Sequence, residues 1–105
     1  MLRRGHLYWA SLDKRRPALL RSPDARNDKA RDVIVIPAST VMREGPWHVR
    51  LKKGEGGVPA PSVLLCEQIT TVPKDCLDPT PLGGPLASVR IGEVERAVLR
   101  AIGVP

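Results

Sequence analysis

Three consecutive cations stand directly before a proline: Lys14, Arg15 and Arg16 precede Pro17. Because proline disfavours the helical region for the residue before it, we expect an extended backbone at Arg16. From the end of a strand, the planar guanidinium of Arg16 would offer N–H donors in a geometry that fits a phosphate with two hydrogen bonds. The segment therefore predicts a phosphate-binding site, with Lys14 and Arg15 adding positive charge. An ordinary charged hairpin is the alternative, and residue types alone do not separate the two.

Two small hydroxyl residues, Ser39 and Thr40, are the second feature that could do chemistry. They follow Pro37, which we expect to end the preceding strand because proline cannot donate a hydrogen bond to a neighbouring strand. Their hydroxyls would then lie at the rim of a sheet, where they can bind phosphate oxygens. The commoner role of such residues is to close a turn, so both interpretations stay open.

Other kinds of catalytic or metal site are not indicated. His6 and His48 are far apart in the sequence, and no His, Cys or carboxylate cluster has the spacing of metal ligands. The chain has neither a G-x-x-x-x-G-K-[ST] phosphate loop nor a G-x-S-x-G nucleophile elbow. Cys66 and Cys76 have the spacing of neither a redox pair nor a zinc ribbon, so we expect two reduced thiols. We therefore expect no metal and no other cofactor.

The positive charge of the chain is concentrated near its N-terminus. The net charge is +6; residues 1–31 contain nine Lys or Arg and three Asp, whereas residues 32–105 contain eight of each sign. A basic first third on a neutral remainder suits a phosphate-bearing partner such as a nucleic acid, although it can also serve solubility alone. Only Tyr8, Trp9 and Trp47 are aromatic, so we expect base stacking to have a minor part.

Length and hydropathy limit the class of protein. A chain of 105 residues is long enough for one domain and too short for two, so we expect a single domain over residues 1–105. There is no run of about 18 apolar residues that would predict a membrane helix. No apolar segment follows the basic N-terminus, so we expect no signal peptide and a cytoplasmic protein with no membrane partner.

Frequent prolines and glycines, eleven and nine in number, indicate short strands with tight connections rather than a helical bundle. The strand over residues 33–36 should be central and buried on both faces because it is continuously apolar. Apolar patterns predict strands at residues 5–12, 17–20, 33–36, 47–51 and 62–69, with at most a short edge strand within 78–85.

Two helices are also expected. Ser22 can cap the first, with Pro23 as its first residue. The second closes the chain, with Ser88 as a candidate cap and Gly103 as a candidate stop. Its amphipathic character follows from helical spacing of the apolar residues, which are Ile91, Val94, Val98 and Ile102.

Several segments recur in the order of a known family. They are residues 5–13, 16–20, 22–27, 34–40 and 48–51, and an amphipathic helix closes the chain. The most specific segment is Ser62-Val63-Leu64-Leu65-Cys66-Glu67-Gln68-Ile69, continued by Thr71, Val72 and Lys74. Together these segments cover most of the chain, and they resemble the MazF/PemK toxins of bacterial toxin–antitoxin systems.

The resemblance implies a fold and an activity. The fold is mainly β within the α+β class: a small, strongly bent β-barrel of the CcdB/PemK type with a C-terminal amphipathic helix, assembled as a homodimer. The activity is that of a growth-inhibiting, metal-independent endoribonuclease that cuts single-stranded RNA at short specific sequences, messenger RNA first and transfer or ribosomal RNA as alternatives. Attack of the ribose 2′-hydroxyl on its own phosphate, leaving a cyclic phosphate and a 5′-hydroxyl, needs mainly positioning and charge stabilisation.

The resemblance also assigns site residues. In the family, an arginine before a proline and a hydroxyl residue after the third strand form the active site. The corresponding residues here are Arg16 and Ser39, with Thr40 as the neighbouring candidate. A guanidinium stays protonated in ordinary surroundings, so its role in proton transfer stays open. Gln68 matches a family glutamine near the bound RNA. The further RNA-binding candidates are Lys14, Arg15, Trp47 and Lys74.

Three departures from the family affect this interpretation. The first hairpin loop is short, because only Lys14 and Arg15 separate Asp13 from Arg16; a longer loop normally helps to cover RNA. Thr70 stands where arginine is frequent, and the closing helix starts without the usual proline and acidic residues. The alternatives are therefore a non-enzymatic toxin that binds gyrase as CcdB does, or a catalytically weak homologue that binds nucleic acid.

A protein partner is implied as well. A toxin of this family would need a cognate antitoxin, and we expect that antitoxin to have a disordered acidic segment. Such a segment would fold onto the basic groove and compete with RNA.

Overall fold

The third strand organises the sheet of this protein. The computed structural model describes residues 1–105, and β3 (Asp32–Ser39) pairs with three other strands in it. The strands β2, β5 and β6 flank it, β4 continues the sheet beyond β5, and β1 and β7 continue it beyond β2, all antiparallel. The remaining strands are β1 (Leu7–Ser11), β2 (Arg15–Leu20), β4 (His48–Leu51), β5 (Ser62–Leu65), β6 (Thr70–Pro73) and β7 (Leu77–Pro81).

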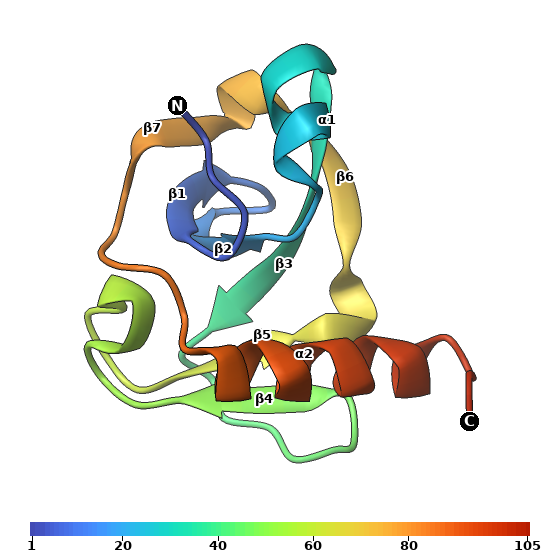
Figure 1. The fold of residues 1–105 in the computed structure, drawn as a ribbon. Helices are drawn as coiled ribbons and strands as arrows, with labels where there is room; N and C mark the ends of the chain where they lie inside the picture. The colour runs from blue at the N-terminus through green and yellow to red at the C-terminus, as the bar shows by residue number, and fades with distance from the viewer.

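The helices lie outside this strongly bent sheet. The short helix α1 (Asp24–Lys29) connects β2 to β3, and α2 (Ser88–Ala101) crosses β4 and the η2 turn at the other end of the molecule (Figure 1). Three single 3₁₀ turns complete the chain: η1 (Glu55–Gly57), η2 (Cys66–Gln68) and η3 (Lys74–Cys76). The predicted fold class, mainly β with a bent barrel-like sheet and a C-terminal helix, is confirmed. Neither helix has the length and apolar composition that crossing a bilayer requires.

Both faces of the central strands are buried, because side chains alternate between two apolar clusters. Leu7 of β1 and Ile36 of β3 belong to the larger cluster, whereas Tyr8 of β1 and Val35 of β3 belong to the smaller one. The larger cluster packs against α2, and the smaller one is covered by Leu2, Leu12 and Val72. This arrangement confirms the doubly buried strand that the apolar run at residues 33–36 predicts.

The prediction that Pro37 ends its strand is wrong, because β3 continues to Ser39. The carbonyl of Ile34 accepts hydrogen bonds from Arg21 and Ser22 on the β2 side. The backbone N–H and C=O groups of successive residues point to opposite edges of a strand. The backbone nitrogen of Pro37 therefore points toward β5 and β6. There the pairing of β3 with β6 stops at Val35 and its pairing with β5 starts at Ala38, so the missing N–H falls in a gap between partners.

The same gap corrects the predicted strand over residues 62–69. That segment is divided into β5, the η2 turn and the approach to β6. Between Leu64, opposite Ala38, and Thr70, opposite Val35, five residues stand against two of β3. The η2 turn takes up this excess chain at the place where proline offers no donor, so the proline interrupts the neighbouring strand rather than its own.

The two helix caps also differ from the prediction. Neither Ser22 nor Ser88 caps a helix with its side chain. The buried Ser22 hydroxyl instead donates to Asn27 Oδ1 at 2.5 Å and accepts the Ile34 N–H at 3.0 Å. Gly103 does end α2 as predicted: its φ is +80°, and the N–H groups of Gly103 and Val104 return to the carbonyls of Arg100 and Leu99.

The apolar stripe of α2 is confirmed for most of its length. Val94 and Ala97 are buried, and Ile91 and Val98 pack against the larger cluster. Ile102, the last residue of the predicted stripe, lies beyond the helix and is 63% exposed.

Close packing of main chain joins η1 to the connection between β7 and α2. Gly57 has φ +89°, and a Cβ added there would lie 2.3 Å from the carbonyl carbon and oxygen of Leu82. A Cβ on Gly83 would likewise lie 2.9 Å from the Cα of Gly57. Only glycine fits at this crossing, which forms one wall of a cavity described below.

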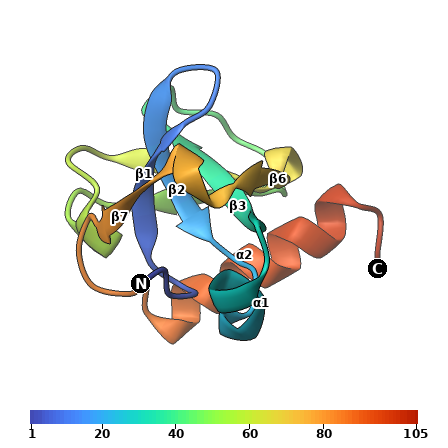
Figure 2. The ribbon, with the colours of Figure 1, turned by 90° about the horizontal axis from the view of Figure 1, so that it is seen from above.

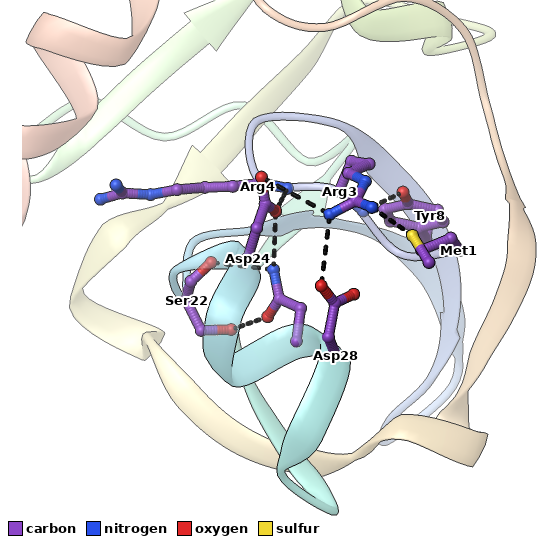
Figure 3. A network of polar contacts seen from close by, with 8 residues as sticks. Met1, Arg3, Arg4, Tyr8, Ser22, Asp24 and Asp28 are labelled. Carbon is purple, nitrogen blue, oxygen red and sulfur yellow. Dashed lines mark hydrogen bonds and ion pairs between the residues drawn. The ribbon is translucent and has the colours of Figure 1, made fainter.

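Part of the basic first third is used to hold the N-terminus against α1 (Figure 3). The Arg4 N–H donates to Asp24 Oδ1 at 2.7 Å, and Arg3 Nη1 lies 3.7 Å from Asp28 Oδ2. The Arg3 N–H donates to the Tyr8 hydroxyl at 2.8 Å. The hydrogen bond from the Arg4 backbone is the main cause of the lowered pKa of Asp24.

Candidate functional site

A cavity of about 220 Å³ lies where the start of β2 meets the end of β3. The antiparallel pairing of β2 with β3 ends at Ala18 and Pro37, and two residues further along each strand lie Arg16 and Ser39, which both line this cavity. The pairing of these two strands therefore brings to one cavity two residues that are 23 positions apart in the sequence. The cavity is lined by Trp9, Lys14, Arg15, Arg16, Pro17, Ala38, Ser39, Thr40, Pro59 and Ser62.

The Arg16 guanidinium is held in place but is not fully hydrogen-bonded. Arg16 lies in β2, where its backbone is extended as the following proline predicts. Its side chain is 13% exposed, and Nη2 donates to Asp13 Oδ2 at 2.9 Å. The Nε–H is buried and has no hydrogen-bond partner. Because the Asp13 side chain is 71% exposed, the ion pair lies at the surface and leaves Arg16 with capacity for a ligand.

The Ser39 hydroxyl closes a turn and still has a proton to donate. Ser39 is the last residue of β3 and is half-buried. Its Oγ accepts the N–H of Val41 at 3.1 Å, which closes a turn. A hydroxyl that accepts from the backbone still has its own O–H to donate, so the same side chain can hydrogen-bond an anion in the cavity. Thr40 is exposed beside it on the same rim.

Trp9 and Arg15 form a further part of the cavity wall. The guanidinium carbon of Arg15 lies 5.2 Å from the centre of a Trp9 ring, and Arg15 Nη2 lies 3.8 Å from Asp78 Oδ2. The sequence predicts a role in this site for Arg15 but not for Trp9. The signal was available in the short hairpin, because its register places Trp9 opposite Pro17, next to Arg16.

The remaining candidates lie outside this cavity. Gln68 is exposed in η2, and Trp47 is nearby, because the Cys66 N–H donates to the Trp47 carbonyl at 3.1 Å. Lys74 lies near the opposite end of β3, where its N–H donates to the Arg31 carbonyl. The eight residues of β3 separate Lys74 from the cavity by roughly 20 Å.

The cysteines and the metal-ligating residue types give no second reactive centre. Cys66 and Cys76 are free, and burial raises the pKa of the Cys66 thiol to about 12, so it is a thiol at neutral pH. No three His, Cys, Asp or Glu side chains converge in a way that could hold a metal ion. The chemistry available in the cavity is therefore that of guanidinium, ammonium and hydroxyl donors directed at an anion.

Comparison with known proteins gives a family match and several similar structures. A family model described as PemK-like, MazF-like toxin of type II toxin-antitoxin system matches residues 3–102. A search of curated proteins finds no match. Among solved structures, the chain is similar to the Mycobacterium tuberculosis toxin MazF-mt6, with 25% identity, 95% of this chain and 98% of that chain covered, and a TM-score of 0.86.

Two further structures extend the comparison. An endoribonuclease in complex with its cognate antitoxin from Mycobacterial species has 26% identity, covers 100% of this chain and 98% of its own, and has a TM-score of 0.85. A MazE-MazF structure from Deinococcus radiodurans has 24% identity, covers 99% of this chain and 97% of its own, and has a TM-score of 0.83. The latter likeness concerns the fold alone.

Proposed function

Because the chain belongs to the family of PemK-like, MazF-like toxins of type II toxin–antitoxin systems, we propose that it is a metal-independent endoribonuclease whose active site is the cavity between β2 and β3. The observation that carries the proposal is the incompletely hydrogen-bonded Arg16 guanidinium in the same cavity as Ser39. A similar structure is named as an endoribonuclease, which supports RNA as the substrate.

The reaction proposed here is attack of a ribose 2′-oxygen on the adjacent phosphorus. The O2′–P bond forms, the P–O5′ bond breaks, and the products are a cyclic phosphate and a 5′-hydroxyl. The 2′-hydroxyl proton passes to solvent and the leaving oxygen takes a proton from solvent, while Arg16 remains protonated. Since the nucleophile belongs to the substrate, the protein contributes positioning and electrostatic stabilisation.

Each residue of the cavity then has a defined task. Arg16 stabilises the negative charge that gathers on the phosphate in the transition state, using the Nε–H that has no partner in the free protein. Ser39 donates its hydroxyl proton to a non-bridging oxygen, with Thr40 as the neighbouring donor. Lys14 and Arg15 attract the phosphate backbone, an effect that makes binding depend steeply on salt.

The candidates outside the cavity would contact nucleotides further along the RNA. Gln68 and Trp47 lie on the same side of the molecule, next to η2, and we assign them to nucleotides beyond the scissile one. Lys74, at the other end of β3, would act on the RNA mainly through its charge.

Two protein partners are part of the proposal. One is a cognate antitoxin with a disordered acidic segment that competes with RNA for the basic cavity; a similar structure is described as a complex with its cognate antitoxin. The other is a second copy of this chain. Exposed apolar side chains on loop 40–47 and at the end of α2 support a homodimer, because Arg100 joins these two segments through the Pro46 carbonyl. They include Val41, Met42, Leu99 and Ile102.

The test is incubation of the purified protein with a long single-stranded RNA in EDTA. We expect fragments with 5′-hydroxyl and cyclic phosphate ends, and no cut where the 2′-hydroxyl is replaced by hydrogen. Arg16→Ala should lower the cleavage rate by roughly two to three orders of magnitude. Arg26→Ala, which removes an exposed cation on α1, is the control for loss of charge alone.

Other outcomes would overturn the proposal. RNA that stays intact at high protein concentration excludes nuclease activity, and cleavage that Arg16→Ala does not change indicates a contaminating enzyme. Capture of gyrase without RNA scission would favour the CcdB-like alternative. Salt-dependent RNA binding without scission would favour a nucleic-acid-binding homologue.

The homodimer and the antitoxin are tested separately. Light scattering should give the mass of two chains, and Ile102→Asp should shift the equilibrium toward one chain. An acidic antitoxin segment should displace bound RNA; failure to do so would contradict the competition model.

A further inference from the structure

A second cavity, of about 330 Å³, adjoins the first and shares two lining residues with it, Trp9 and Pro59. It opens between β1, β7 and η1. A nucleotide whose phosphate occupies the first cavity can therefore extend its base past Trp9 into the second. The other lining residues are Gly57, Asp78, Thr80, Pro81 and Leu82.

An irregularity in the pairing of β1 with β7 creates this space. Tyr8 pairs with Pro81, but Ala10 pairs with Leu77, so the register shifts between the two pairs. Trp9, the single residue between them on β1, stands against residues 78–80 on β7. Such bulges redirect side chains and interrupt regular pairing, and here the extra residues bring Asp78 and Thr80 to the same cavity as the indole.

The Asp78 carboxylate is oriented but keeps a free acceptor. Its Oδ1 accepts the N–H of Thr80 at 3.0 Å, which fixes the side chain. Its Oδ2 lies 3.8 Å from Arg15 Nη2, which is too long for a hydrogen bond. Arg15 is held over Trp9 instead. The cavity thus presents an aromatic surface beside a fixed carboxylate oxygen that has no hydrogen-bond donor.

We propose that this second cavity binds the nucleobase next to the phosphate held by Arg16, and that it selects a base with an exocyclic amino group. The inference rests on the proposed function, since it supplies the base that belongs to that phosphate. An aromatic side chain binds any base by stacking, whereas a carboxylate accepts from an amino group, as in contacts to cytosine N4. Cytosine, adenine and guanine carry such a group. Uracil has no amino group, and its one donor on that edge, N3–H, is flanked by two carbonyl oxygens, which the carboxylate repels.

The experiment measures binding without cleavage, using the fluorescence of Trp9. Trp9 and Trp47 are the two tryptophans, so Trp47→Phe leaves Trp9 as the sole indole reporter. This variant is titrated with the 3′- and 5′-monophosphates of cytidine, adenosine, guanosine and uridine. We expect quenching of Trp9, with at least one of the amino-bearing bases binding roughly tenfold more tightly than uridine phosphate.

Asp78→Asn, made in the same background, tests the carboxylate itself. The asparagine carbonyl can still accept the Thr80 N–H, so the turn is retained, but its amide can donate to uracil. We expect the preference over uridine phosphate to disappear while quenching remains. Asp75→Asn removes the same charge from an exposed residue in η3, and it should leave the preference unchanged. Thermal unfolding of each variant verifies that it is folded.

Equal binding of all four nucleotides, absence of quenching, or a preference that survives Asp78→Asn would overturn the inference. The result is independent of catalysis. A base preference in a protein that does not cut RNA would contradict the proposed function alone. Cutting of RNA with no base preference in the titration would contradict this inference alone.

Discussion

Two guanidinium groups at different places in the fold, those of Arg16 and Arg90, differ in how completely they are hydrogen-bonded. At the start of α2, Arg90 Nε and Nη2 donate to the two oxygens of Glu55 at 2.8 and 2.9 Å, and Nη1 donates to Glu93. This fork lowers the pKa of Glu55 to about 2 and raises the pKa of Arg90. Arg16 makes one side-chain hydrogen bond, to the exposed Asp13, and its Nε–H has none.

The difference separates an arginine that fastens the fold from one that can bind a ligand. The side chains of Arg16 and Arg90 are 13% and 25% exposed, so burial alone does not distinguish them. Arg90, whose guanidinium nitrogens all donate hydrogen bonds, joins the η1 turn to α2. The unsatisfied Nε–H of Arg16 costs free energy in the free protein, and an anion in the cavity would remove that cost. The number of hydrogen bonds that each guanidinium makes therefore distinguishes Arg16, the candidate ligand-binding cation, from Arg90, whereas local charge does not.

The largest expected effect comes from replacing each arginine by lysine, which keeps the charge and removes the fork. Arg16→Lys should lower RNA cleavage about tenfold to a hundredfold without changing the melting temperature. Arg90→Lys should lower the melting temperature by about 5–10 °C and leave cleavage per folded molecule unchanged. Cleavage assays at equal folded concentration and thermal unfolding followed by circular dichroism measure both. Loss of cleavage in Arg90→Lys at an unchanged melting temperature would contradict the assignment of Arg90 to the fold and of Arg16 to ligand binding.

A smaller effect is expected from Asp13, the carboxylate that an RNA phosphate would displace from Arg16 under the proposed function. Asp13→Asn should strengthen binding of an uncleavable 2′-deoxy oligonucleotide by up to about fivefold, since an exposed ion pair contributes at most about 1 kcal/mol. Fluorescence anisotropy at fixed salt measures the change. Asp28→Asn makes the same change in net charge beside Arg3, near the N-terminus. Equal strengthening by both variants would mean that net charge alone is responsible.

The smallest effect concerns stability in acid. The folded-state pKa of Glu55 is about 2, below its ordinary value of 4.5, so its contribution is present above pH 4.5 and is lost as the pH falls toward 2. We expect the melting temperature to fall over that range, and Glu55→Gln to be less stable at pH 7 but flatter in acid. Glu44→Gln, which removes an 86% exposed carboxylate, is the control. If the melting temperature of Glu55→Gln falls with pH as steeply as that of the unchanged protein, the ionisation of Glu55 is not coupled to folding.

The sequence predicts those parts of the fold that follow from local pattern. The central strand follows from its apolar run, the end of α2 from Gly103, and the extended backbone at Arg16 from Pro17. The resemblance predicts that Arg16 and Ser39 meet, and both line one cavity because the pairing of β2 with β3 ends two residues from each of them.

The features that the sequence does not predict depend on contacts between distant segments. Pro37 continues its strand because the missing donor faces a gap that exists only once β5 and β6 share one edge of β3. Trp9 and Asp78 meet because of a register shift between β1 and β7, which no local pattern specifies. The basic first third likewise divides, since Arg3 and Arg4 hold the N-terminus against α1, while Arg15 and Arg16 begin β2 and pair with Ser11 and Ala10 at the other end of β1. Figure 2 shows the β1–β2 turn at this end, on the opposite side of the molecule from α1.

The glycine crossing between Gly57 and Gly83 restricts how the second cavity can change. Its main-chain atoms approach too closely to admit a side chain, so substitutions cannot reshape that wall. Under the proposed function, new cut-site preferences in this scaffold would then arise at the side chains opposite, chiefly Trp9, Asp78 and Thr80. A combinatorial library confined to those three positions would sample altered sequence selectivity while leaving Arg16 and Ser39 untouched.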